Sequence, residues 1–182
     1  AAGGGEEHRV APGGGPGAGQ GGSGTASVIV AADIGMCGSP GPEATALLID
    51  RLPGRLLLAG DIAYMHGSTV DFQRCFDPAW GRFRGRWHAV PGNHEYQTPH
   101  AAPFFEYFGD AAGADGTGYY SLRIGDWQVL MLNSTAPAGR GSPQWDFARR
   151  ELEIERRACT LAVWHHPVFT SGPNGPNAFM RD

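Results

Sequence analysis

The sequence predicts a mixed α/β sandwich with helices on the outside and sheets on the inside. Four apolar runs are each followed within three residues by a side chain that can bind a metal, and they span residues 28–32, 55–59, 87–90 and 159–164. Helical patterns separate the first three runs, an alternation typical of parallel βαβ units. A hairpin pattern further along the chain adds antiparallel strands, so we expect the sheets to be mixed.

Composition is consistent with one folded domain after a glycine-rich start. Of the 182 residues, 41% are hydrophobic, which is enough to fill a core. Residues 1–26 are rich in glycine and offer little apolar surface, so we predict a flexible linker or tail there and a catalytic domain over 27–182. No G-K-[ST] triplet follows the glycines, which excludes a P-loop.

Charge and hydropathy argue against a nucleic-acid partner and against a membrane-spanning helix. The net charge is −4 and the pI is about 6.0, so the chain lacks the basic footprint of a nucleic-acid-binding protein. No run approaches the ~20 apolar residues that a membrane-spanning helix needs. Oligomeric state cannot be predicted from these features.

The first half of the domain alternates strands and helices. After the strand at 28–32, we predict a helix over 43–52, ended by a Pro-Gly pair. Its apolar residues predict a buried face made of Ala46, Leu47, Ile49 and Leu52. A second helix, interrupted by a proline, is predicted near 70–84, between the strands at 55–59 and 87–90.

The second half begins with a change of period. Two apolar runs, 119–124 and 127–132, are joined by Gly125-Asp126, which predicts a two-residue hairpin. Ser142 and the proline after it then form a helix start, and the helix is predicted to run to about residue 157 with Trp145, Ala148 and Leu152 on one face.

The three cysteines, Cys37, Cys75 and Cys159, form no C-x-x-C pair, which argues against a zinc ribbon or a thioredoxin motif. One disulfide and one free thiol would suit an oxidising compartment. The sequence does not select the pair.

Polar side chains at the four strand ends predict a metal site. Asp33, Asp61, Asn93 and His165 each follow an apolar run, and ligands in open α/β sheets bind at the carboxyl ends of strands. Their oxygen and nitrogen donors suit iron, manganese or zinc. Asp61 follows the central strand and is the natural bridge between two ions, which together would generate a hydroxide and hold a phosphoryl group.

Four motifs carry a family resemblance. In chain order they are Asp33-Ile34-Gly35, Gly60-Asp61-Ile62-Ala63-Tyr64, Gly92-Asn93-His94-Glu95 and Trp164-His165-His166-Pro167. In order and spacing the set resembles the calcineurin-like metallophosphoesterases, and within them the purple acid phosphatase branch. The resemblance implies an α/β/β/α sandwich.

The resemblance also implies a role for each site residue. Asp33 and Tyr64 would bind the first metal, Asp61 would bridge, and Asn93 and His165 would bind the second metal. The implied cofactors are two divalent or trivalent ions, Fe(III) with Fe, Mn or Zn.

The remaining motif residues are assigned supporting and catalytic roles. His94 would stabilise the phosphoryl oxygens or protonate the leaving group, acting with Asp61 and its bridged ions. Glu95 would support the ligands from behind, and His166 would line the cleft.

One motif of the family, G-H-x-H, is missing. We therefore interpret residues 27–182 as the N-terminal two-thirds of a C-terminally incomplete catalytic domain, lacking one ligand for each metal. Neither metal binding nor activity of this chain by itself is assured.

Three functions remain open. The first is a hydrolase that cleaves phosphate monoesters of small molecules through a metal-bridging hydroxide. The second keeps this chemistry but acts on diesters, such as cyclic nucleotides or phospholipid headgroups. The third is a non-catalytic binding module on a degenerate scaffold. The tether and the resemblance favour a secreted or cell-surface protein, with a cytoplasmic one as the alternative.

Overall fold

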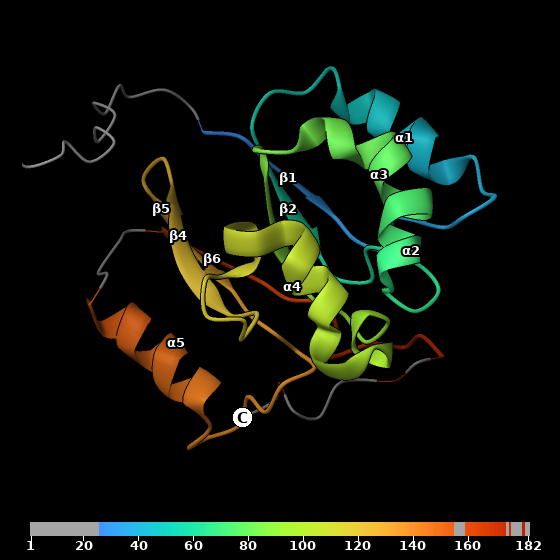
Figure 1. Cartoon of the computed structure of the whole chain (residues 1–182). Helices are drawn as coiled ribbons and strands as arrows, with labels where there is room; N and C mark the ends of the chain where they lie inside the picture. The colour runs from blue at the N-terminus through green and yellow to red at the C-terminus, as the bar shows by residue number, and fades with distance from the viewer. Residues whose placement is uncertain (1–25, 155–158, 174, 176–179, 181–182) are drawn as a thin grey trace, which may run out of the picture.

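The computed structural model describes residues 26–154, 159–173, 175 and 180. The predicted glycine-rich tail lies outside these residues except for Ala26. The described part forms two three-stranded sheets flanked by helices (Figure 1). The predicted mixed α/β fold is therefore confirmed.

The first sheet is entirely parallel, with strand order β1-β2-β3. The three strands are β1 (Val28–Ala31), β2 (Arg55–Ala59) and β3 (Trp87–Val90). Because parallel strands run in the same direction, their carboxyl ends lie at one edge of the sheet. This edge carries the loops that begin at Asp33, Asp61 and Pro91.

The second sheet is mixed, with order β4-β5-β6. β4 (Tyr120–Ile124) and β5 (Trp127–Met131) form the predicted antiparallel hairpin, and β6 (Cys159–Val163) pairs with β5 in parallel. His165 follows the carboxyl end of β6. The carboxyl ends of β1 and β2 in the first sheet lie on the same side of the molecule, where Asp33 and Asp61 are found.

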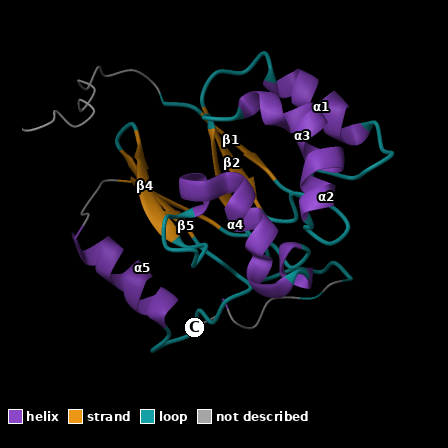
Figure 2. Ribbon diagram, viewed as in Figure 1, coloured by secondary structure: helices purple, strands orange, loops and turns teal. Residues whose placement is uncertain are grey.

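Helices cover the outer faces of both sheets (Figure 2). They are α1 (Gly41–Ile49), α2 (Thr69–Asp71), α3 (Asp77–Trp80), α4 (Ala102–Phe108) and α5 (Pro143–Ile154). A π-helical turn, Phe72–Phe76, joins α2 to α3, and a 3-10 turn, Gly81–Phe83, follows α3, so the predicted helix near 70–84 is four short pieces. Residues 104–108, over which no helix is predicted from the sequence, lie in α4 and include four aromatic side chains.

Two predicted helix faces are partly wrong. In α1, Ala46 and Ile49 are buried, but Leu47 is 54% exposed, and Leu52 lies beyond the helix end and is 47% exposed. In α5, Leu152 is 51% exposed and Gln144 is the buried residue. The helix contacts the second sheet through a polar group as well, since the Gln128 side chain donates to the Glu151 carbonyl of α5.

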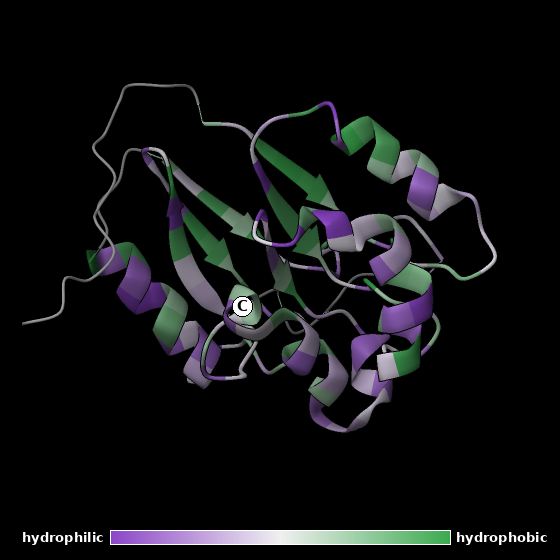
Figure 3. Cartoon of the chain, turned by 45° about the horizontal axis from the view of Figure 1, so that its top comes forward, coloured by the Kyte–Doolittle hydropathy of each residue, from purple (hydrophilic) through white to green (hydrophobic). Residues whose placement is uncertain are grey.

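The core has two parts, one on each side of the first sheet. Figure 3 shows that hydrophobic residues predominate in the strands that separate them. Leu57, Ala59 and Val90 pack against the second sheet, through residues such as Val129 and Met131. On the opposite face, helix and strand residues form a larger aromatic cluster that includes Phe72, Phe76, Trp80, Trp87, Phe104 and Phe108. None of the helices among the described residues has the length and apolar character to span a bilayer.

A disulfide joins Cys37 to Cys75 and resolves the pairing that the sequence left open. Cys159 is free and exposed. The bond ties the loop after β1, four residues beyond Asp33, to the π-helical turn.

The disulfide is expected to contribute substantially to stability. It closes a loop with a sequence separation of 38. Replacing both cysteines with serine should therefore lower the free energy of unfolding by about 4 kcal/mol in the loop-entropy description. Urea unfolding under non-reducing conditions measures this loss. Cys159→Ser is the matched control and should change stability by less than about 0.5 kcal/mol.

Candidate metal centre

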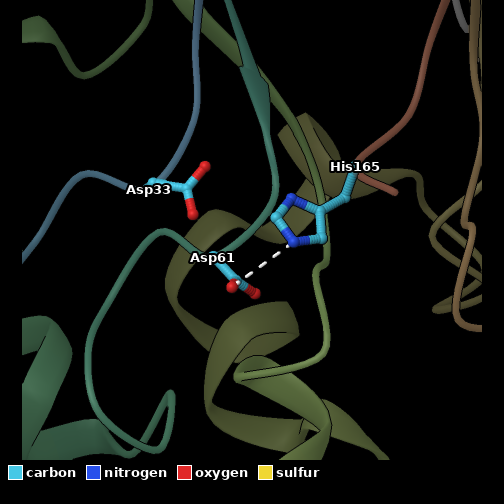
Figure 4. A group of neighbouring side chains, drawn as sticks. All are labelled: Asp33, Asp61 and His165. Atoms are coloured by element: carbon cyan, nitrogen blue, oxygen red, sulfur yellow. Dashed lines mark ion pairs between the residues drawn. The ribbon is translucent and has the colours of Figure 1, made fainter. Parts of the chain in front are cut away.

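Three predicted ligands converge where the strands end. Asp33 follows β1, Asp61 follows β2 and His165 follows β6, and each places one ligand atom within 4.8 Å of the others. Figure 4 shows their side chains pointing into the same space. Residues 132 apart in the chain thus share one site, because both sheets present their carboxyl ends to it.

The backbone at two of these residues is strained. Asp33 has a φ of 57° and Asp61 a φ of 50°, in the left-handed region that non-glycine residues seldom occupy. Strained backbone tends to gather at functional sites, where the surrounding structure holds it. Here hydrogen bonds join the two turns: Asp33 N–H donates to the Gly60 carbonyl and Ile34 N–H to the Asp61 carbonyl.

Asp61 lies at the centre of the cluster and is 4% exposed. Its Oδ2 is 3.3 Å from His165 Nε2 and 3.7 Å from His94 Nε2, and its Oδ1 accepts a 3.0 Å hydrogen bond from the His94 backbone N–H. Burial alone raises the pKa of Asp61, but the hydrogen bonds to His165 and His94 and their charges lower it overall. The Asp61 side chain is therefore a carboxylate anion, the form that binds a cation.

His165 is oriented by the backbone of the central strand. Its Nδ1 lies 2.8 Å from the Ala59 carbonyl oxygen, so Nδ1 donates to that carbonyl and Nε2 faces Asp61. Burial lowers the pKa of His165, yet the hydrogen bond to Asp61 and the nearby negative charges outweigh this and raise it. A backbone acceptor behind a histidine is the usual support for a metal-binding imidazole.

Tyr64 reaches both aspartates. Its hydroxyl donates to Asp33 Oδ1 at 2.6 Å and lies 3.2 Å from Asp61 Oδ2. Burial, followed by the hydrogen bond to Asp33 and the two negative charges, raises the pKa of Tyr64. In the absence of a cation the phenol therefore keeps its proton, which a metal would have to displace to bind there.

Asn93 and His94 lie on the loop after β3. The Asn93 side chain is exposed, and its role as a ligand stays a prediction. His94 contacts Asp61 through both its backbone N–H and its ring, and the ring packs 4.5 Å from the Tyr64 ring. His94 therefore borders the cluster on the side of the second motif.

Glu95 holds the second and third motifs together. Its side chain is fully buried and accepts four backbone hydrogen bonds. Oε2 binds the N–H groups of Asp61 and Gly92, and Oε1 binds those of Ile62 and Ala63. Burial raises the pKa of Glu95, while the backbone hydrogen bonds oppose that rise. The residue supports Asp61 from behind the site.

Two glycines permit this close packing. A Cβ at Gly92 would lie 2.2 Å from Asp61 Oδ1, and one at Gly60 would lie 2.7 Å from the Cβ of His165. Such distances are well inside contact, so neither position accepts a side chain without moving the site. The glycines of the G-D and G-N-H-E motifs thus set how closely the loops approach.

His166 has a partner that the sequence did not identify. Its backbone N–H donates to Ser134 Oγ at 3.0 Å, and its Nδ1 lies 2.9 Å from the same oxygen. Burial and the neighbouring His165 lower the pKa of His166. Ser134 follows the end of β5, so the strand-end signal that marked the metal ligands was present here too.

Comparison with known proteins identifies the family. The profile of the calcineurin-like phosphoesterases matches residues 26–181 of the chain. The chain belongs to the calcineurin-like phosphoesterase family. The resemblance of the four motifs to the calcineurin-like metallophosphoesterases is therefore confirmed, and the assignment to the purple acid phosphatase branch stays a prediction.

The phosphoesterase also has a distant curated relative. The chain is 25% identical over 135 residues to a phosphoenolpyruvate phosphatase of Allium cepa. That alignment covers 64% of this chain but 28% of the relative, so the chain matches only part of that protein's length. The comparison supports a phosphoesterase hydrolase at the level of the family.

The side chains of this phosphoesterase fit the metals that the family implies. Two carboxylates, one phenol and one imidazole face a common space, and such mixed oxygen and nitrogen donors suit iron, manganese or zinc. A backbone acceptor behind His165 and four backbone donors around Glu95 keep the donors in place. The arrangement can hold a cation and present it to an anionic substrate.

Proposed function

We propose that this chain belongs to a phosphatase that hydrolyses phosphate monoesters of small molecules with the help of two metal ions. The observation that carries the proposal is the convergence of Asp33, Asp61 and His165 within 4.8 Å, with the Tyr64 hydroxyl on both carboxylates. Asp33 and Tyr64 would hold one ion, Asn93 and His165 the other, and Asp61 both. When bound, such ions supply a nucleophilic hydroxide near neutral pH and neutralise the phosphoryl oxygens.

The chain's own residues would position the substrate and handle its protons. His94 borders the cluster and presents Nε2 beside Asp61, from which it would contact a phosphoryl oxygen or give a proton to the leaving oxygen as the P–O bond breaks. Ser134 holds the neighbouring His166 through two contacts, which keeps that ring at the rim of the site.

Two observations support the finer assignment. The Tyr64 hydroxyl lies between two carboxylates, a position from which a phenolate could bind a metal, as the resemblance to the purple acid phosphatase branch implies. Fe(III) is the ion that suits such a ligand in that branch. The curated relative is named for phosphoenolpyruvate, which is a phosphate monoester. We therefore prefer a monoesterase of this branch.

The same proposal extends to organisation and location. We propose that residues 27–182 form the N-terminal two-thirds of the catalytic domain, with the remaining metal ligands supplied by a G-H-x-H segment beyond them. The Cys37–Cys75 disulfide favours an oxidising compartment, which supports a secreted or cell-surface protein.

Hydrolysis of two model substrates tests the proposal. The full-length protein, loaded with metal, should cleave nitrophenyl phosphate with a kcat/KM at least about 10-fold above that for bis-nitrophenyl phosphate, which corresponds to about 1.4 kcal/mol of selectivity. The reverse preference would assign the phosphodiesterase alternative. Metal and phosphate binding with no turnover of either substrate would assign the non-catalytic module.

A further inference from the structure

A glutamine joins two histidine rings beside the metal centre. The Gln97 amide oxygen is 2.6 Å from Nδ1 of His66, and the amide nitrogen is 3.1 Å from Nδ1 of His94. The carbonyl oxygen of Met65 lies 2.5 Å from that same His94 nitrogen. Two groups therefore face Nδ1 of His94, on the side of the ring away from Asp61.

The Met65 carbonyl decides where the His94 proton lies. A carbonyl oxygen only accepts, so its contact with Nδ1 of His94 requires an N–H there. That nitrogen then has no lone pair for the Gln97 amino group. The two halves of a glutamine amide have nearly the same shape, so turning the Gln97 amide by 180° leaves the distances in place. Its oxygen then accepts from His94, and its amino group donates to Nδ1 of His66.

We propose that Gln97 is a positioning residue for His94. Together with the Met65 carbonyl it holds the His94 proton on Nδ1, and this turns Nε2 toward Asp61, 3.7 Å away. The neighbouring His66 is then the Nε2–H tautomer, with Nδ1 as the acceptor. The inference rests on the proposed function, in which Nε2 of His94 contacts a phosphoryl oxygen or protonates the leaving oxygen after the ring has taken up a second proton at that nitrogen.

Backbone packing keeps the three residues together. A Cβ at Gly67 would lie 2.5 Å from the Cα of Glu95, so the loop carrying Met65 and His66 lies directly on the segment carrying His94 and Gln97. Within that segment, the Gln97 N–H donates to the His94 carbonyl at 3.2 Å. The His66 N–H is bonded in turn to Asp71 Oδ2. The amide therefore links two loops whose backbones are already fixed.

Nitrogen-15 NMR of the histidine rings tests the proposal on the metal-free chain, at a pH where the rings are neutral. His66→Ala and His94→Ala spectra assign the signals. We expect His94 as the Nδ1–H tautomer and His66 as the Nε2–H tautomer. Because no metal or turnover is needed, failure of this proposal and failure of the phosphatase assignment are separate results.

Substitutions of Gln97 give the sharper result. A carboxylate only accepts, so Gln97→Glu should leave the His94 proton on Nδ1 but move the His66 proton from Nε2 to Nδ1. Gln97→Leu removes one acceptor and should raise the Nε2–H fraction of His94 about 5-fold. The matched control is Gln73→Glu, because Gln73 is an exposed glutamine on the π-helical turn. This substitution should leave the tautomers of His66 and His94 unchanged.

Three outcomes would overturn the proposal. One is a wild-type His94 that carries its proton on Nε2. The second is a Gln97→Glu chain in which the His66 tautomer does not change. The third is a Gln97→Leu chain whose His94 signals equal those of the wild type. Gln97 is exposed, so the fold should tolerate these changes, and if the leucine variant fails to fold, the glutamate variant decides.

Discussion

Replacing Glu95 with glutamine is expected to lower the free energy of unfolding by about 3 kcal/mol. The carboxylate accepts from four backbone N–H groups, two on each oxygen. Glutamine keeps the shape but turns its NH₂ group toward one of these pairs, so two buried donors lose their acceptor and face another donor. Chemical denaturation monitored by circular dichroism measures the loss.

Glu106 provides the control for this change, since it is an exposed glutamate on α4. Its replacement with glutamine should shift stability by less than about 0.5 kcal/mol. If Glu95→Gln unfolds at the same denaturant concentration as the wild type, Glu95 does not organise the two motif loops, and the account of how Asp61 is held is wrong.

Asp61→Asn should weaken metal binding by at least about 100-fold, because loss of a residue that merely supports a ligand already weakens binding ~10–100-fold. The Asp61 carboxylate contacts both His94 and His165, with its Oδ2 3.7 Å from Nε2 of His94 and 3.3 Å from Nε2 of His165. Asparagine is isosteric and neutral, so it removes the charge and keeps the packing. Calorimetric titration of the metal-free chain with zinc reports the change.

The controls separate charge from folding. Asp126 lies in the exposed turn between β4 and β5. Asp126→Asn should therefore leave the zinc affinity within about twofold of the wild-type value. Circular dichroism should show that Asp61→Asn retains the native fold. Equal zinc affinity of Asp61→Asn and the wild type would mean that the cation binds elsewhere.

Most of the scaffold could be predicted from local sequence pattern. Largely apolar runs marked β2 and β3 to the residue, since strands buried on both faces carry few polar side chains. The strand-end rule then brought Asp33, Asp61 and His165 to one edge. These features depend on periodicity and topology, which short stretches of sequence carry.

Features that depend on long-range contacts could not be predicted in this way. The Cys37–Cys75 pair depends on where the π-helical turn lies, and Leu47 is exposed although Ala46 and Ile49 on the same helix are buried. α4 is only Ala102–Phe108, too short for a clear period, although Phe104 and Phe108 are one turn apart and buried. Gln97 carries no motif at all, and its contacts exist only because two loops meet.

Anomalous diffraction from crystals of this chain grown with zinc is the most direct measurement of the metal centre. The account predicts an anomalous peak about 2.0–2.2 Å from a carboxylate oxygen of Asp61 and from Nε2 of His165, with Asp33 and Tyr64 facing the same space. Anomalous peaks only at other side chains, with no metal bound to Asp61 or His165, would contradict it.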